Sequence, residues 1–187
     1  MPENKPCPQV AKNKPHPQVV GLSEKVLRDG VQICIISNMS KIVGYMVTWT
    51  TYGSWLPGDK RGYVDNGKIL LGNVKILERN RKRQKSSIVK LNAWEKEIVK
   101  QTILAEAEKS EHKIEALVVY SNHIHLLARP HTESIEELVG RYKSMTTRAL
   151  WQRGRKGRIW TKGYDKRFCF SEEELAARIR YVQNHND

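Results

Sequence analysis

The chain has 187 residues, which is enough for one hydrophobic core of ordinary size and too short for two. Its 33 Lys and Arg outnumber 20 Asp and Glu, and the resulting net charge of +13 predicts a polyanionic partner, with nucleic acid first. Three scattered cysteines exclude a disulfide framework and a zinc ribbon, and they fit a reducing cytoplasm. Apolar runs such as 31–36 are far too short to span a bilayer, so no membrane role is expected.

Residues 1–42 are expected to form a largely flexible N-terminal extension. They contain a repeat of period nine, in which Asn4–Val10 recurs as Asn13–Val19, and its prolines oppose both helix and central strand. The domain proper is predicted over 43–187.

The domain opens with a run of β-forming residues over 43–50, which predicts the first strand. A Gly- and Pro-containing loop follows over 52–59. In this loop we expect Trp55 to close the end of the core, whereas Tyr52 fits either a core position or a base-stacking role.

Seven Lys or Arg and one Glu fall between residues 75 and 90, so this stretch is predicted to be a solvated flexible loop that contacts phosphates. An amphipathic helix is then predicted over 91–110, with Asn92 as a plausible cap. The apolar stripe assigned to the core of this helix consists of Leu91, Trp94, Ile98, Thr102 and Ala105.

Two strands are predicted over 113–120 and 123–128, forming an antiparallel hairpin with a tight corner at Ser121 and Asn122. Strand side chains alternate between faces, so His123 and His125 lie on one face, at a spacing that lets both bind one divalent cation.

A helix over 134–151, a strand within 160–170 and a last helix opened by Ser171 complete the chain. This order predicts an α+β fold, a ferredoxin-like antiparallel β-sheet with helices packed on one face, plus a C-terminal helix.

The C-terminal helix places Tyr181 and His185 four residues apart on one face. It could therefore deliver a nucleophile and a third metal ligand together, with Gln183 and Asn184 as alternative ligands to His185. The His-hydrophobic-His motif preceded by Asn, the basic helix after it and the C-terminal Tyr-aliphatic motif resemble the HUH single-tyrosine transposases, including the REP-associated tyrosine transposases. The resemblance extends from about Gly44 to the end.

The resemblance implies an enzyme that cleaves and rejoins single-stranded DNA. Tyr181 would be the nucleophile, and Mg²⁺ or Mn²⁺ would be bound by His123, His125 and His185. The product of cleavage would be a 5′-phosphotyrosine link and a free 3′-hydroxyl, which allows strand transfer and DNA transposition. The expected partner is single-stranded or hairpin DNA in the bacterial cytoplasm at the nucleoid, with the protein acting as a monomer or a homodimer.

Two other functions stay open. One is a domesticated relative that only binds DNA. The other is a nuclease that uses water as the nucleophile, which is less favoured because no cluster of carboxylates accompanies the histidines.

Ten Lys or Arg and one Asp fall between residues 141 and 167, interleaved with aromatic residues, a mixture suited to a single strand. Among the aromatic residues, Trp151 and Trp160 are expected to be packed. The residues predicted to contact DNA are Arg141, Lys143, Arg148, Arg153, Arg155, Lys156, Arg158 and Lys162.

Overall fold

The computed structural model describes residues 41–65 and 68–184. The N-terminal extension predicted over 1–42 therefore lies outside the described residues, except for its last two. In the described part of the chain, no helix combines the length and the apolar character needed to cross a membrane.

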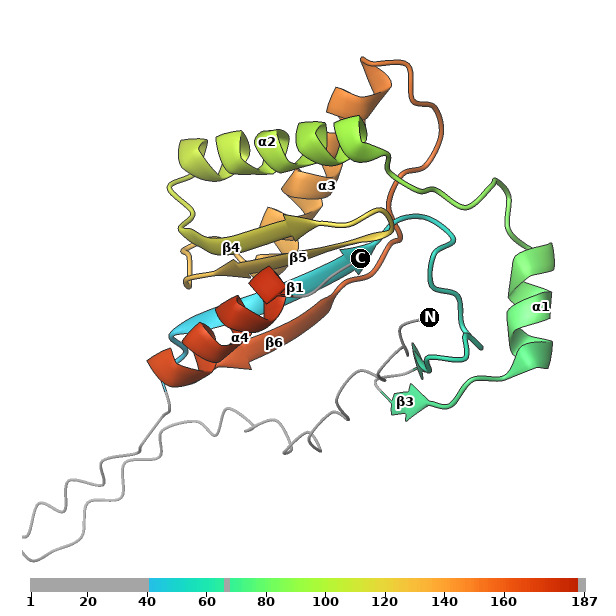
Figure 1. Cartoon of the computed structure of the whole chain (residues 1–187), viewed down its shortest axis with the longest axis horizontal. Helices are drawn as coiled ribbons and strands as arrows, with labels where there is room; N and C mark the ends of the chain where they lie inside the picture. The colour runs from blue at the N-terminus through green and yellow to red at the C-terminus, as the bar shows by residue number, and fades with distance from the viewer. Residues whose placement is uncertain (1–40, 66–67, 185–187) are drawn as a thin grey trace, which may run out of the picture. The chain divides into compact units, whose positions relative to one another are not determined.

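A four-stranded antiparallel sheet and three helices form the main body of the fold, and a small hairpin and a short helix are inserted after the first strand (Figure 1). The elements are β1 (Gly44–Thr50), β2 (Tyr63–Asp65), β3 (Lys68–Leu70), α1 (Val74–Lys82), α2 (Ala93–Lys109), β4 (Ile114–Val119), β5 (His123–Ala128), α3 (Ile135–Trp151), β6 (Asp165–Cys169) and α4 (Glu172–Asn184). The sheet order is β4-β5-β1-β6, and the predicted α+β class is confirmed.

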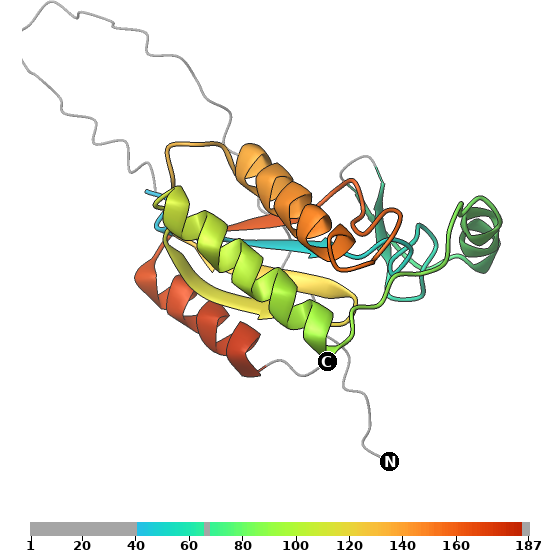
Figure 2. The same ribbon diagram turned by 90° about the horizontal axis from the view of Figure 1, so that it is seen from above.

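Alternation along β1 and β5 gives the sheet two different faces. Val47, Trp49 and Ile124 point to one face and are buried in the larger core under α2 and α3. Met46 and Leu127 point to the other face, where α4 covers a smaller core. Figure 2 shows α2 and α3 together on one side of the sheet and α4 apart from them. The predicted arrangement of helices on one face plus a C-terminal helix is therefore correct.

Polar caps fix where the helices begin. Asn92 precedes α2 and accepts from the backbone N–H of Glu95, whose carboxylate accepts from the N–H of Asn92 in return. Ser134 and Glu137 make the same reciprocal pair at the start of α3. These side chains satisfy N–H groups that the first helical turn leaves without intrahelical partners.

The apolar stripe predicted for α2 is correct in part: Leu91 is buried and Ile98 packs against the core, whereas Trp94 and Ala105 are exposed. The buried residues of α2 are Glu95, Val99, Ile103 and Ala107, whereas Trp94 is 58% exposed. Glu95 can be buried because its carboxylate also accepts from the Arg155 guanidinium at 3.0 Å, which pairs the charge. The helix therefore turns a charged residue inward and an indole outward.

Residues 75–90 were predicted to be a flexible loop, but they include most of α1. The Asn73 side chain caps this helix by accepting from the Ile76 N–H at 3.1 Å. Gly58, at φ +94°, approaches the helix so closely that a Cβ would lie 2.4 Å from the backbone N of Leu77. Backbone contact with a neighbouring loop thus supports a helix that has no buried residue.

Two tryptophans predicted to be packed are exposed. Trp55 is 42% exposed, with the Arg61 guanidinium 4.5 Å from its ring centre, and Trp151 is 51% exposed. Each indole N–H donates to a backbone carbonyl, of Gly62 and Gly157 respectively, so neither ring needs the core to satisfy its polar atom. Trp160 is buried, as predicted.

His112 links three elements inside the core. Its Nε2 lies 2.8 Å from the Tyr45 hydroxyl on β1, and its Nδ1 lies 2.6 Å from the Tyr142 hydroxyl on α3. Burial, with a smaller contribution from the neighbouring His131, lowers the pKa of His112 from 6.5 to about 4. The imidazole is therefore neutral in the folded protein at neutral pH.

This buried histidine predicts a pH-dependent stability. Between pH 6.5 and about 4 the unfolded chain binds a proton at His112 that the folded protein does not. Stability should therefore be complete above pH 6.5 and fall by roughly 3 kcal/mol as the pH approaches 4. Urea unfolding of the wild type and His112→Asn across this range measures the effect. The variant should be less stable at pH 7 and should have the flatter profile; equal slopes would show that His112 does not titrate as described.

Candidate active site

The β4–β5 hairpin positions the histidine pair predicted from the sequence. His123 is paired with Thr50 and His125 with Thr48 on β1. Their side chains lie on the α4 face of the sheet because Ile124, between them, is fully buried in the opposite core. The two imidazole ring centres are 4.8 Å apart. The predicted common face of the two rings is confirmed.

One nitrogen of each imidazole is held by an oxygen atom. The Nδ1 of His123 lies 2.6 Å from the Asn122 Oδ1, and the Nδ1 of His125 lies 2.7 Å from the Thr48 Oγ1. An amide oxygen only accepts, so the Nδ1 of His123 carries the proton and its Nε2 carries the lone pair. Fixing a histidine through its second nitrogen is the usual way in which proteins orient a metal-binding imidazole. The donor set therefore fits a divalent cation.

Tyr120 forms a wall beside the pair, a role that sequence reasoning did not assign. It is 5% exposed, and its ring stacks on His123 with ring centres 4.5 Å apart and packs edge-on against His125 at 6.0 Å. A tyrosine at the end of an apolar strand is typical of a core residue. Its position directly before the hairpin turn was the only signal of a role in the site.

The fourth helix covers the face that carries the histidines. Leu175, near the start of α4, packs against Gly44, where a Cβ would lie 2.9 Å from the leucine Cδ1. From this end of β1 the helix runs in the direction of the strand (Figure 1), and Val182 is buried in the smaller core near its end. Tyr181 directly precedes Val182 and is 37% exposed. The predicted nucleophile thus lies on the helix that covers the histidine face.

The third predicted ligand, His185, lies outside the described residues. Its alternatives Gln183 and Asn184 are exposed in the last turn of α4. Across residues 41–65 and 68–184, no three His, Cys, Asp or Glu side chains are close enough to hold a metal ion together. The described part of the site therefore offers two imidazoles, and the third ligand stays a prediction.

The residues predicted to contact DNA fall into two groups. Several make contacts within the protein: Arg141 pairs with Glu133, Arg155 pairs with Glu95, and the Lys143 ammonium donates to the carbonyl of Gly163 at 2.8 Å. Burial lowers the pKa of Lys143 to about 8. The others, Arg148, Arg153, Lys156, Arg158 and Lys162, make no ion pair with any described residue, and all five are exposed.

The loop 152–158 brings two of these cations close to aromatic rings, of which Trp94 is exposed and Tyr52 is partly buried. The Arg153 guanidinium lies 5.9 Å from the ring centre of Trp94, and the Arg158 guanidinium lies 5.5 Å from that of Tyr52. A cavity of about 280 Å³ beside them is lined by Ser86, Ser87, Ile88, Val89, Arg155, Lys156, Gly157 and Arg158. Cations alternating with aromatic faces suit a flexible polyanion that carries planar bases.

This loop is connected to the end of the sheet where the histidines lie. The backbone N–H of Tyr52 donates to the carbonyl of Ile159 at 2.7 Å, and the N–H of Thr51 donates to the carbonyl of Asn122 at 2.9 Å. Consecutive residues of one segment therefore contact the end of the basic loop and the turn that precedes His123.

A comparison with protein-family models identifies the chain. Residues 76–185 match the model described as transposase IS200-like. The chain belongs to the IS200-like transposase family. Transposases cut and rejoin DNA, so DNA transposition is the general function of the family to which this protein belongs.

Two solved structures resemble the chain weakly. A REP-associated tyrosine transposase bound to a REP hairpin shares 12% identity over 76% of this chain and 65% of its own, with a TM-score of 0.44. A Deinococcus radiodurans R1 protein assigned as a transposase shares 16% identity over 77% of this chain and 91% of its own, with a TM-score of 0.40. No protein of curated function matches the chain.

The histidine-orienting contact gives a testable prediction. Removing the Thr48 hydroxyl in Thr48→Val should leave the His125 ring without its Nδ1 partner and weaken Mn²⁺ binding by about 10- to 100-fold. Isothermal titration measures the affinity. Thr50→Val is the matched control because Thr50 lies on the same strand face but bonds the Thr161 hydroxyl. Equal effects of the two variants would contradict the orienting role.

Proposed function

We propose that this protein cleaves and rejoins single-stranded DNA in a metal-dependent reaction through a 5′-phosphotyrosine intermediate. The observation that carries the proposal is the location of Tyr181 on the helix that covers the face where His123 and His125 lie side by side. Membership of the transposase family supports the same chemistry.

The metal site would be formed by the imidazoles of His123 and His125, with a third ligand from His185, Gln183 or Asn184. Mg²⁺ or Mn²⁺ bound there would polarise a non-bridging oxygen of the scissile phosphate and stabilise the charge that develops in the transition state.

Tyr181 would be the nucleophile. Its oxygen bonds to phosphorus while the bond from phosphorus to the 3′-oxygen breaks, so the 5′ phosphate stays on the tyrosine. The proton lost from the tyrosine balances the proton gained by the 3′-hydroxyl. Attack of a 3′-hydroxyl on the phosphotyrosine link reverses these steps and joins strands without a nucleotide cofactor.

The DNA strand would approach along loop 152–158. Exposed Arg153, Lys156 and Arg158 would neutralise phosphates, and Trp94 and Trp151 would stack on bases. Arg155 would act indirectly by holding the loop against Glu95.

A second function follows if Tyr181 performs no chemistry. The exposed cations and tryptophans would still bind DNA, and the protein would then be a domesticated, non-catalytic DNA-binding relative of the transposases.

Covalent trapping tests the reaction. A 3′-labelled single strand carrying a cleavable site should form a denaturant-stable protein adduct with Mn²⁺, because tyrosine attack leaves the 5′ end of the labelled fragment on the protein. Tyr181→Phe should bind this DNA and form no adduct, and His125→Ala should reduce adduct formation at least about 100-fold.

Tyr164→Phe is the matched control because Tyr164 is another tyrosine of the basic region. This variant should still form the adduct. An adduct in Tyr181→Phe would move the nucleophile to another residue. Cleaved DNA without an adduct would favour water as the nucleophile, and binding without cleavage by the wild type would favour the non-catalytic relative.

A further inference from the structure

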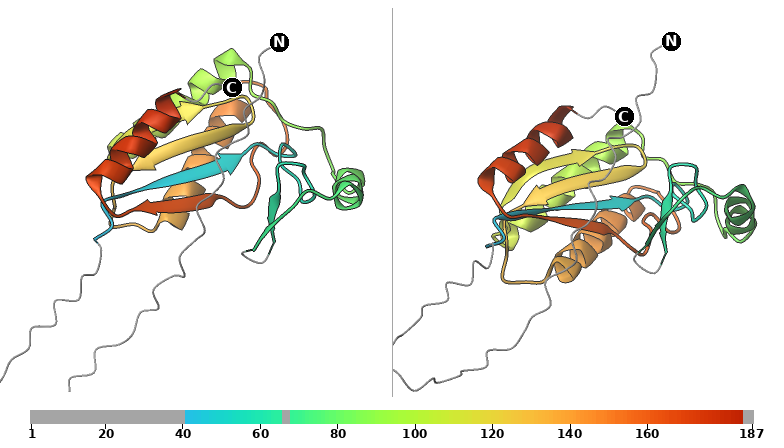
Figure 3. Two further views of the ribbon diagram at one scale, coloured as in Figure 1. Left: turned by 60° about the horizontal axis from the view of Figure 1, so that its bottom comes forward. Right: turned by 90° about the horizontal axis from the view of Figure 1, so that it is seen from below.

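The short helix α1 lies apart from the four-stranded sheet (Figures 1 and 3). It packs against no other described helix or strand, and none of its nine residues is buried. Isolated helices of this length are marginal in water, and most helices in proteins are stabilised by burying an apolar face. The helix α1 therefore depends on contacts outside the core for its stability.

The orientation of α1 is nevertheless fixed by its neighbouring loop. Asn73 donates its backbone N–H to the carbonyl of Gly58 at 2.9 Å, and the Asn80 amide donates to the carbonyl of Pro57 at 3.1 Å. Gly58 allows this close approach because it has no Cβ. These contacts hold one side of the helix.

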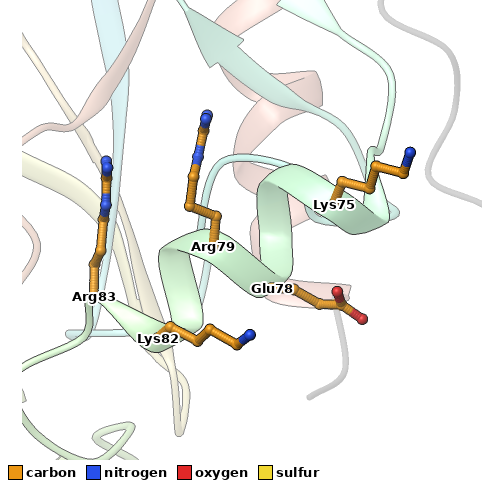
Figure 4. Close-up of a pocket in the computed structure, with 5 residues that line it drawn as sticks. All are labelled: Lys75, Glu78, Arg79, Lys82 and Arg83. Carbon is orange, nitrogen blue, oxygen red and sulfur yellow. The ribbon is translucent and has the colours of Figure 1, made fainter.

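The charged side chains of α1 are almost all basic. Residues 75–85 contain six Lys or Arg and one acid, Glu78. Four of the cations, Lys75, Arg79, Lys82 and Arg83, border a shallow hollow of about 340 Å³ together with Glu78 (Figure 4).

None of these four cations makes an ion pair or a side-chain hydrogen bond with the described part of the chain, in contrast to Arg141 and Arg155. Like charges this close repel one another, and a polyanion relieves that repulsion while releasing its own counterions. Like Arg153, Lys156 and Arg158, the α1 cations pair with no carboxylate of the described residues and are available to a polyanion.

The arrangement favours duplex over single-stranded DNA. A helix places Lys75, Arg79 and Arg83 in one row with a rise of about 6 Å per step, and such a rigid row suits the regular backbone of a duplex. The major groove admits an α-helix. Single strands are recognised largely by aromatic stacking, and α1 contains no aromatic residue. The exposed Trp94 and Trp151 lie beside loop 152–158, and the ring of Trp55, in the loop next to α1, faces the Arg61 guanidinium.

We propose that α1 and its basic hollow are a docking surface for duplex DNA, such as the stem of a hairpin whose single-stranded flank reaches the histidine site. The part of this proposal that concerns the single-stranded flank rests on the proposed function, whereas duplex binding by α1 does not depend on it.

Two matched triple variants test this surface. Arg79→Gln, Lys82→Gln and Arg83→Gln together remove three charges from α1 and keep residues that favour helix. The variant should bind a fluorescent hairpin at least about tenfold more weakly near 0.1 M salt, and the slope of log affinity against log salt should fall by about 2 to 3. Its affinity for an unstructured strand of equal length should change by less than about twofold.

The control variant removes three exposed lysines from the region of α2, namely Lys100→Gln, Lys109→Gln and Lys113→Gln, and it has the same net charge. It should retain hairpin affinity. Equal losses in the two variants would show that only net charge matters, and equal losses for hairpin and single strand in the α1 variant would show that α1 does not distinguish duplex DNA. Either result overturns the proposal.

Adduct formation on saturating single strand separates this proposal from the proposed function. The α1 variant should form the adduct at the wild-type rate. If the wild type forms no adduct, the proposed chemistry fails, while the comparison of hairpin affinities still decides whether α1 binds duplex DNA.

Discussion

The pairing of β1 with β5 at the centre of the sheet is the constraint on which the site depends. This register sets Thr48 opposite His125 and Thr50 opposite His123, so the polar residues of both strands share one face. The apolar residues between them fill the core under α2 and α3. A slip of one residue would bury both imidazoles in that core and expose Ile124, so packing and the geometry of the site are specified together.

The molecule has two kinds of basic surface. Near the histidines, the Arg155–Glu95 pair holds loop 152–158, and exposed cations of this loop such as Arg153 stand beside exposed indoles such as Trp94. On α1 the cations pair with no carboxylate of the described residues, and the helix contains no aromatic residue. One surface suits a flexible strand whose bases are unstacked, and the other suits a regular backbone. A nucleic acid with both features would use both surfaces.

Local patterns were sufficient to predict much of the fold. Alternation predicted the common face of the two histidines, and Asn92 signalled where one helix begins. The prediction failed where distant residues decide the outcome. Trp94 is exposed because Arg155, sixty residues away, allows Glu95 to be buried. The role of His185 stays a prediction.

The short helix and Tyr120 were missed for related reasons. α1 has no apolar stripe, and the contact with Gly58 that supports it is not visible in its own sequence.

Crystals soaked with Mn²⁺ test the central claim, that this sheet face is a metal-dependent active site. The account predicts an anomalous scattering peak at coordination distance from the Nε2 atoms of His123 and His125. A peak only at other side chains, with the histidine pair ordered, would contradict it.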